Sequence, residues 1–428
     1  MIKLSLILAG LAICNAALAV LMPWYVVTRL GVGIETDAFF ASAALPQMIF
    51  LVVSFSLPHV LVPLLATEDE KTFRRDAWGF FLGVTGLFSL LALGLFLTAG
   101  LWVPKMVLGF SDHAKVLAIS LSRIQLLGMI GNASVVVLWS VYNARHKFIW
   151  VELSSVFANI AALLYLVWLL PSHGIAAAAW ATVLNLGLKL ALLLPILGRV
   201  QRPQWNSYAM REARRRIKPF LFGQAYSKIE PLIDRPLVSM GIAGDLSLLY
   251  IAQQMYSAVN IVITKAIAGP TVPRLATAAK SGDLLSFRRI YRHRLFWMAG
   301  ICVLGAIILL VFGEPILRLL IGQGGITARN VHKIWLITLA LIGVLVGGTA
   351  GQLTAIAFYA MGDTKTPTNL FIWTFTIYLP IKVMAFFHYG LIGLAIATSV
   401  HLIVNFLLQL LVLERRTFGT RMAALKAR

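Results

Sequence analysis

The sequence has little charge, and little of that charge is negative. Only 12% of its 428 residues are charged, and Lys and Arg outnumber Asp and Glu by 37 to 16. Hydrophobic residues make up 60% of the chain, and the mean hydropathy is +0.86. A soluble domain carries a much smaller apolar share. The composition therefore indicates a protein that crosses a membrane many times.

Cysteine is almost absent, since Cys14 and Cys302 are the only two and each lies in an apolar stretch. This excludes a disulfide framework and a cysteine-rich metal site, and we expect neither a metal ion nor a cofactor. The sequence also has no loop of the G-x-x-x-x-G-K-[ST] type, so direct drive by ATP is not expected. The positive charge falls mostly in short segments between apolar stretches, where membrane topology and anionic lipids account for it. We therefore expect no nucleic-acid partner.

The hydrophobic pattern predicts an all-α integral membrane protein with about 12 transmembrane helices. The first stretch imitates a cleavable signal peptide, but its hydrophobicity continues through Val27, so we expect a retained helix. The predicted spans are 4–27, 38–66, 77–101, 115–142, 150–170, 174–198, 219–241, 245–277, 295–313, 331–358, 368–387 and 391–413.

When the loops are assigned alternately to two sides, most Lys and Arg gather on the side of both termini. The positive-inside rule then predicts cytoplasmic N- and C-termini, with anionic membrane lipids at the basic loops. The densest basic segment is 199–218, which we expect to be a cytoplasmic surface helix.

Two halves of the chain resemble each other. Gly174-Ile-Ala-Ala-Ala-Ala-Trp-Ala-Thr182 matches Gly390-Leu-Ile-Gly-Leu-Ala-Ile-Ala-Thr398, and Asp37 before one span matches Asp245 before another. Six spans per half give both halves one orientation, which predicts two six-helix bundles related by a pseudo-twofold axis along the membrane normal. The predicted parts are an N-terminal lobe, a basic linker, a C-terminal lobe and a basic tail, over 1–198, 199–218, 219–413 and 414–428.

Four charges interrupt the predicted span 219–241, namely Lys228, Glu230, Asp234 and Arg235. At 1.5 Å per residue they fall near the middle of a bilayer, where each charge costs about 2.5–3.5 kcal/mol. Such charges either bind a transported molecule or balance one another within the bundle, and Pro231 and Pro236 interrupt the helix that carries them. Because the loops are short, the sequence favours a transporter with a central cleft over an enzyme.

Other polar residues within spans have simpler interpretations. We expect Asp37 and Asp245 to be N-caps of the spans that follow them. Lys189 and Lys382 are expected to pair or to extend toward the headgroups, and His401 to make an interhelical contact.

The motif Gly33-Ile-Glu-Thr-Asp-Ala-Phe-Phe-Ala41, followed by Leu45-Pro46 and Pro63, resembles the N-terminal lobe of the MurJ-like lipid II flippases. Phe222-Gly223, Tyr250-Ile-Ala252 and Pro273-Arg-Leu-Ala276 are similar to that family's second lobe. The family belongs, with polysaccharide flippases and the multidrug and toxin extruders, to one exporter superfamily.

The resemblance extends over essentially the whole chain, but two features differ. By alignment, the cavity arginines of lipid II flippases fall at or near Ala16, Met22, Phe50 and Gln254, none of which is basic. Those flippases usually have two further C-terminal spans, which this sequence does not show. We therefore expect a flippase for another lipid-linked saccharide of the cell envelope.

The resemblance implies alternating access in a bacterial inner membrane, with a polyprenyl-diphosphate-linked saccharide as substrate. Lys228, Arg235 and Lys265 could attract the diphosphate. Amides could bind the sugar hydroxyls, and the candidates are Gln253, Gln254, Asn260 and Asn159. Carboxyl groups could couple an ion gradient, or simply balance the cations, and the candidates are Glu230, Asp234 and Glu152.

Three other functions remain open. An ion-coupled multidrug exporter predicts an acidic cavity, whereas the first span has no carboxylate. A glycan ligase or polymerase needs catalytic groups on a large outer loop, and the outer loops are short. A scaffold for glycan-biosynthesis proteins would need no transport site.

Overall fold

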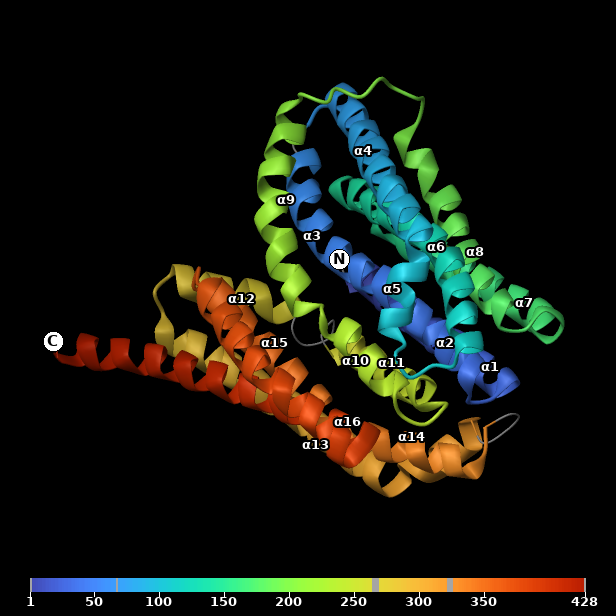
Figure 1. The fold of residues 1–428 in the computed structure, drawn as a ribbon. Coiled ribbons are helices and arrows are strands. Elements are labelled where there is room, and N and C mark those ends of the chain that lie inside the picture. Colours follow the sequence, from blue (N-terminus) through green and yellow to red (C-terminus); the bar gives the residue numbers. More distant parts are fainter. Residues whose placement is uncertain (1, 67, 264–268, 322–325, 427–428) are drawn as a thin grey trace. The chain divides into compact units, whose positions relative to one another are not determined.

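The computed structural model of the chain describes residues 2–66, 68–263, 269–321 and 326–426. Every regular element among these residues is a helix (Figure 1). The helices are α1 (Ile2–Leu30), α2 (Ile34–Ser42), α3 (Ala44–Ala66), α4 (Glu70–Leu97), α5 (Ala99–Met106), α6 (Asp112–Ala144), α7 (Phe148–His173), α8 (Ile175–Leu193), η1 (Leu194–Leu197), α9 (Tyr208–Ser227), α10 (Glu230–Ser239), α11 (Asp245–Ile263), α12 (Gly269–Lys280), α13 (Leu284–Ile321), α14 (Ala328–Ala340), α15 (Ile342–Ala360) and α16 (Lys365–Lys426).

Within the described residues, nine helical stretches are long and apolar enough to cross a membrane. The all-α membrane architecture is therefore confirmed, although the count of twelve is not. The nine stretches are Ile7–Leu30, Ile34–Ala66, Glu70–Leu97, Asp112–Ala144, Phe148–His173, Ile175–Leu197, Leu284–Leu319, Ala328–Ala360 and Lys365–Thr417.

The last stretch contains two of the predicted spans. Its 53 residues would extend about 80 Å as one helix, far more than a bilayer. Gly390 breaks it with φ 60° and ψ −146°. Side chains on the two sides of the break then pair in antiparallel order, because Thr374 contacts His401 and Tyr378 contacts Thr398. Residues 365–389 and 391–426 therefore form a helical hairpin.

Gly174 joins α7 to α8 in the same way, with φ 58° and ψ −149°. A side chain rarely adopts a positive φ, so glycine suits both positions. Gly174 and Gly390 are the matched residues of the internal repeat, and their nearly identical backbone angles agree with a duplicated half.

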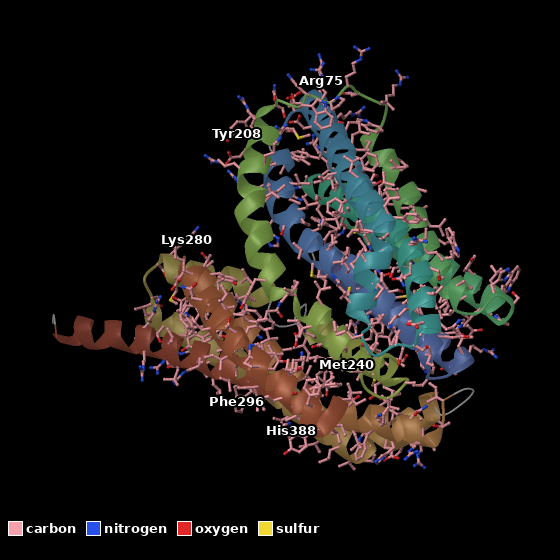
Figure 2. The ribbon with its side chains drawn as sticks, in the orientation of Figure 1. Arg75, Tyr208, Met240, Lys280, Phe296 and His388 are labelled. Carbon is pink, nitrogen blue, oxygen red and sulfur yellow. The ribbon has the colours of Figure 1, made fainter. Side chains whose placement is uncertain are left out.

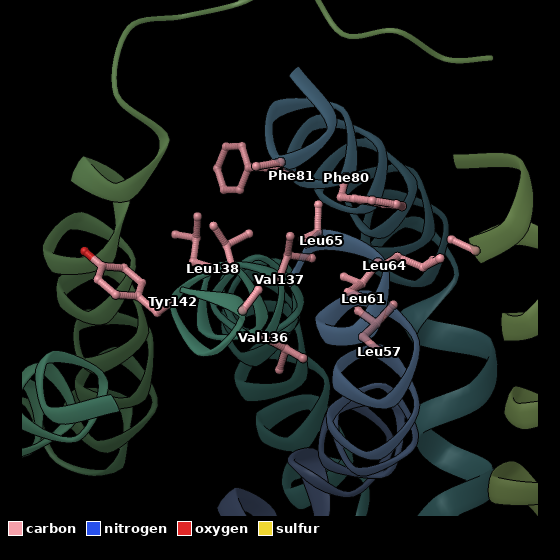
Figure 3. Packing of buried hydrophobic residues seen from close by; sticks show 14 of the residues in the cluster. Leu57, Leu61, Leu64, Leu65, Phe80, Phe81, Val136, Val137, Leu138 and Tyr142 are labelled. Atoms are coloured by element: carbon pink, nitrogen blue, oxygen red, sulfur yellow. The ribbon is translucent and has the colours of Figure 1, made fainter. Parts of the chain in front are cut away.

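The described residues divide into two compact units, Met1–Ser247 and Leu248–Arg428. In the first unit, α3, α4, α6 and α9 enclose a core in which Leu61, Leu65 and Val137 are completely buried (Figure 3). In the second, Leu275, Phe287 and Leu413 are completely buried in a smaller core. The lobe boundaries expected from the sequence stay a prediction.

The stretch 219–241 is not one continuous helix, because α9 ends at Ser227 and α10 begins at Glu230. Pro231 explains the break. Its nitrogen carries no hydrogen, so it cannot bond to the carbonyl of Ser227, four residues earlier, and its ring disfavours helical geometry at the preceding residue. Pro231 is instead tolerated in the first turn of α10.

The basic linker also differs from the surface helix that we expected over 199–218. Residues 199–207 form no helix, and α9 begins only at Tyr208 before continuing into the predicted span. The first turns of α9 pack on α3 and α4 (Figure 1), where Ala209, Met210 and Ala213 are buried. The start of α9 is therefore part of the core of the first unit.

Candidate functional site

A chain of hydrogen-bonded polar side chains connects three membrane helices of the first unit. Asn15 of α1 donates to the Glu152 carboxylate of α7 at 2.9 Å. Asn159, two turns further along α7, donates to the Asn15 side-chain oxygen at 3.1 Å. Asn185 of α8 donates to the Asn159 oxygen at 2.7 Å. We call Glu152, Asn15, Asn159 and Asn185 the amide chain.

Lys189 lies one turn beyond Asn185 on α8 and interacts electrostatically with Glu152. The expectation that Lys189 pairs or extends toward the headgroups stays a prediction. A carboxylate, a lysine and three amides in apolar surroundings form a polar network, and such a network is costly unless its members satisfy one another. The arrangement can hold a proton or stabilise a small cation at Glu152.

The sequence indicated Glu152 and Asn159 separately but gave them different roles. The structure brings them together through Asn15, which sequence reasoning did not select. Both polar atoms of the Asn159 side-chain amide are engaged, because its nitrogen donates to Asn15 and its oxygen accepts from Asn185. A polar residue within the apolar stretch of the first span was the only signal for Asn15.

The four charges of the stretch 219–241 lie around the helix break. Lys228 stands between α9 and α10 and interacts electrostatically with Glu230, the first residue of α10. Asp234 and Arg235 are almost fully buried, with 2% and 3% of their surfaces exposed. Lys228 thus follows the end of α9, and Glu230 begins α10. Asp234 and Arg235 lie in a buried turn of α10.

The end of α10 is held closely against the turn that follows α5. The Gly109 amide donates to the Ser239 hydroxyl at 3.3 Å, and that hydroxyl donates to the Pro236 carbonyl at 2.7 Å. A Cβ on Gly109 would lie 2.2 Å from the Ser239 carbonyl oxygen, so only glycine permits this approach.

Asp37 does not cap its own helix, because it lies inside α2. Its carboxylate instead accepts hydrogen bonds from the backbone amides of Gly244 and Ser247, at 2.6 and 2.8 Å, and from the Ser247 hydroxyl at 2.6 Å. These donors surround the start of α11, where unpaired amides and the helix dipole favour an anion. Asp37 is therefore a long-range cap. Asp245 is the first residue of α11, so its prediction as an N-cap is also wrong.

In the second unit, Gln253, Gln254 and Asn260 all lie on α11. The Gln254 side chain donates to the Tyr250 hydroxyl at 2.8 Å. Lys265, the remaining candidate for phosphate binding, lies outside the described residues.

The hairpin of α16 contains a buried polar cluster. Lys382 is completely buried and faces the ring of Tyr378 at 5.2 Å. The His401 ring stacks on the Tyr378 ring, with centroids 4.4 Å apart. It also contacts the Thr374 hydroxyl at 3.3 Å. The interhelical contact expected for His401 is confirmed, and Lys382 is buried against the Tyr378 ring.

Two carboxyl groups lie close together where α3 turns into α4. Glu68 precedes α4 and lies outside the apolar stretches, and Asp76 lies in the second turn of α4. Burial raises the pKa of Glu68 to about 8, with a further contribution from the nearby carboxyl of Asp76. Asp76 is 1% exposed, so its carboxyl lies beside Glu68 largely shielded from solvent. Arg145 lies beside the pair, where its guanidinium covers the Phe73 ring at 3.8 Å and donates to Glu70 at 3.2 Å.

Comparison with solved structures identifies the class of this fold. The chain matches the inward closed conformation of the lipid II flippase MurJ with a TM-score of 0.79, at 18% identity over 96% of this chain and 87% of that one. An inward-facing multidrug transporter of the MATE family also gives a TM-score of 0.79, at 15% identity over 98% and 99% of the two chains. The chain thus has the fold of these two membrane transporters, the second of which belongs to the MOP superfamily.

The family follows from sequence comparison. A family model described as lipid II flippase MurJ matches residues 26–427. The probable lipid II flippase MurJ of Buchnera aphidicola is 21% identical over 92% of this chain and 80% of its own length. That of Vibrio cholerae is 23% identical over 95% and 81%. The chain belongs to the MurJ family of lipid II flippases, which are transporters and not enzymes, and it is a multi-pass protein of the bacterial inner membrane.

Proposed function

We propose that this protein moves a polyprenyl-diphosphate-linked saccharide of the cell envelope from the cytoplasmic to the outer leaflet by alternating access. The observation that supports this most strongly is the family match, which extends over residues 26–427. The orientation follows from the Lys and Arg distribution, with both termini in the cytoplasm. Anionic lipids then contact the basic loops, and glycan-biosynthesis proteins deliver or consume the substrate.

Within this proposal, Lys228, Arg235 and Lys265 attract the diphosphate, and the α11 amides Gln253, Gln254 and Asn260 bind sugar hydroxyls. One of these assignments draws support from the structure. Lys228 lies at a helix break, where backbone polar groups are also available, and breaks of this kind line substrate sites in other transporters.

The amide chain has the properties of a coupling site rather than of a sugar site. Glu152 holds the carboxyl group that binds the proton or cation, and Lys189 supplies the counter-charge when that ion leaves. Asn15, Asn159 and Asn185 orient the carboxylate through hydrogen bonds. Glu230 and Asp234 remain the second candidates for ion coupling.

The test is a transport measurement in cells that lack this protein and any redundant flippase. Lipid-linked saccharides, including lipid II, are extracted and assigned to a membrane face. We expect one intermediate to accumulate on the cytoplasmic face, and the wild type to clear it. Lys228→Ala with Arg235→Ala should fail to clear it, whereas the exposed control pair Arg211→Ala with Arg289→Ala should succeed.

The lipid that accumulates distinguishes the possible substrates, and an unchanged lipid pool distinguishes a flippase from a drug exporter. Accumulation of lipid II identifies it as the substrate, and accumulation of another lipid-linked saccharide identifies that one. An unchanged lipid pool, together with increased sensitivity to cationic drugs, would contradict the proposal and favour an ion-coupled multidrug exporter.

A further inference from the structure

A basic cavity opens at the first turns of α4, in the unit Met1–Ser247. It has a volume of about 480 Å³ and lies between α4 and the segment that precedes α9. Three cations face it, Lys71 and Arg75 from α4 and Arg202 from the segment. The rest of its described lining is Gln201, Pro203 and Gln204, so no acidic side chain is among the lining residues.

The segment that forms the cavity wall opposite α4 is held in place by hydrogen bonds. The Trp78 indole donates to the carbonyls of Leu197 and Arg199, at 3.2 and 3.1 Å, and so holds the start of the segment on α4. Further along, Arg214 donates to the Trp205 carbonyl. The cations are therefore presented by two elements whose spacing is maintained by hydrogen bonds.

Gly83 of α4 lets the segment lie close to the helix, because a Cβ on Gly83 would come within 3.1 Å of the Trp205 ring. Gly79, one turn earlier on the same face, makes room for α9, because its Cβ would lie 2.5 Å from the end of the Met210 side chain. Trp205, which is 48% exposed, is thereby placed beside the cavity. Tryptophan is typical of the headgroup level of a membrane.

The two carboxylates at the start of α4 have other partners. Glu70 binds Arg74 at 2.7 Å and Arg145 at 3.2 Å. Asp69 is exposed and caps the start of α4 by accepting from the Lys71 and Thr72 amides. Neither carboxylate lines the cavity, and the charged groups that do are all cations.

An apolar stripe continues from the cations along α4. At 100° per residue, Lys71, Arg75, Leu82, Leu93 and Leu97 lie within about 80° of one helix face. The three leucines are 41%, 56% and 71% exposed, as expected of a surface that faces lipid. Leu82 is about 10 Å beyond Arg75 along the helix axis, within reach of an acyl chain whose phosphate binds at Arg75.

We propose that this cavity is a binding site for an anionic phospholipid of the cytoplasmic leaflet. The phosphate binds Lys71, Arg75 and Arg202, and one acyl chain lies along the leucine face of α4. Figure 2 shows Arg75 and Tyr208 at the same end of the first unit, the end that we assign to the cytoplasm. The cavity is large enough for a glycerophosphate headgroup and too small for a diphosphate with several sugars, so it is distinct from the proposed substrate site.

The experiment uses the full-length protein, purified and exchanged into mixtures of phosphatidylglycerol and phosphatidylethanolamine. Native mass spectrometry counts the lipids retained. We expect the wild type to keep one phosphatidylglycerol preferentially. In the triple variant Lys71→Gln, Arg75→Gln and Arg202→Gln, the affinity for this lipid should fall on the order of 100-fold, because each cation near a lipid surface contributes about 1 kcal/mol.

The matched control removes the same charge from exposed positions that do not line the cavity, Lys147→Gln, Arg211→Gln and Arg289→Gln. It should retain phosphatidylglycerol as the wild type does. Thermal stability in lipid-free detergent, measured for all variants, establishes that each is folded. Retention of the lipid by the folded triple variant, or an equal loss in the control, would overturn the proposal.

A third arm separates a lipid from a free anion. Inorganic phosphate is added to the lipid-free wild type, and the thermal stability is compared with that after addition of phosphatidylglycerol. We expect stabilisation by the lipid and little by phosphate, because phosphate cannot occupy the leucine face. Equal stabilisation by phosphate would contradict a lipid site. A flipping assay on the same variants keeps this result independent of the proposed transport function.

Discussion

Glu68 gives the protein a stability that depends on pH. In the folded protein, burial and the neighbouring Asp76 raise the pKa of Glu68 from its ordinary value of 4.5 to about 8. The folded chain therefore holds a proton that the unfolded chain releases at lower pH. Between about pH 4.5 and pH 8 the unfolded state binds fewer protons, so the free energy of unfolding falls as the pH rises. A protonated Glu68 carboxyl can lie beside the buried Asp76 carboxyl, whereas an ionised Glu68 is repelled by it.

The magnitude follows from the position of the carboxyl. One unit of pKa corresponds to about 1.36 kcal/mol. Solvent reaches part of Glu68, so screening reduces the whole effect to about 1–2 kcal/mol. Arg145 acts in the opposite direction, since its charge favours the ionised form. Converted at about 2–4 °C per kcal/mol, the loss between pH 5.5 and pH 8.5 is a few degrees.

The assay is thermal unfolding in detergent, followed by tryptophan fluorescence, from pH 5.5 to pH 8.5. Glu68→Gln imitates the protonated form, so it should lose a few degrees less than the wild type over this range. Asp76→Asn should have a smaller effect of the same sign, because it removes the repulsion but leaves Glu68 buried. The control Glu35→Gln, at an exposed position, should follow the wild type. If Glu68→Gln loses as much stability as the wild type, the carboxyl pair does not govern this pH dependence.

Three further predictions concern the membrane helices. Lys189→Met should leave Glu152 without its counter-charge and cost about 3 kcal/mol, and adding Glu152→Gln should restore most of the folded yield measured by size exclusion. Asp37→Ala should accelerate amide hydrogen exchange in the first turn of α11, since it removes the acceptor of two backbone amides there. Gly347→Ala should destabilise by about 1–3 kcal/mol, because the new Cβ would lie 2.6 Å from the backbone of α16, whereas Gly348→Ala, with 3.9 Å, should be tolerated.

The sequence predicted the class of fold because apolar length and loop charge are local properties. Each of the first six predicted spans corresponds to an apolar helix, and the repeat of Gly174 at Gly390 located the break in the last hairpin. Four of the remaining spans also fall within apolar helices, namely 295–313, 331–358, 368–387 and 391–413. The stretch 219–241 does not form one continuous helix, because prolines interrupt it. Pro231 ends α9 because it cannot donate a hydrogen bond to the Ser227 carbonyl, four residues earlier. A hydropathy pattern does not show this effect.

The site was less predictable because its contacts join distant parts of the chain. Glu152 was recognisable as a carboxyl within a span, but its partner Asn15 lies 137 positions away. Asp37 has the sequence context of an N-cap, and it does cap a helix, although that helix begins 208 residues later in the chain at Asp245. Sequence pattern identifies a residue that needs a partner, whereas only the packing of helices identifies the partner.

The charges that interrupt the seventh predicted span and the helix break at Lys228 explain each other. A helix ends with partial negative charge and begins with partial positive charge. Lys228 follows the end of α9, and Glu230 is the first residue of α10. Each charge therefore lies at the helix end that stabilises it, which offsets part of the cost of placing it within a membrane. Lys228→Arg should preserve this arrangement, and Lys228→Ala should weaken it. Lys228→Ala removes both the proposed substrate contact and the charge that stabilises the break between α9 and α10. Lys228→Arg keeps that charge, so transport by the two variants is measured side by side.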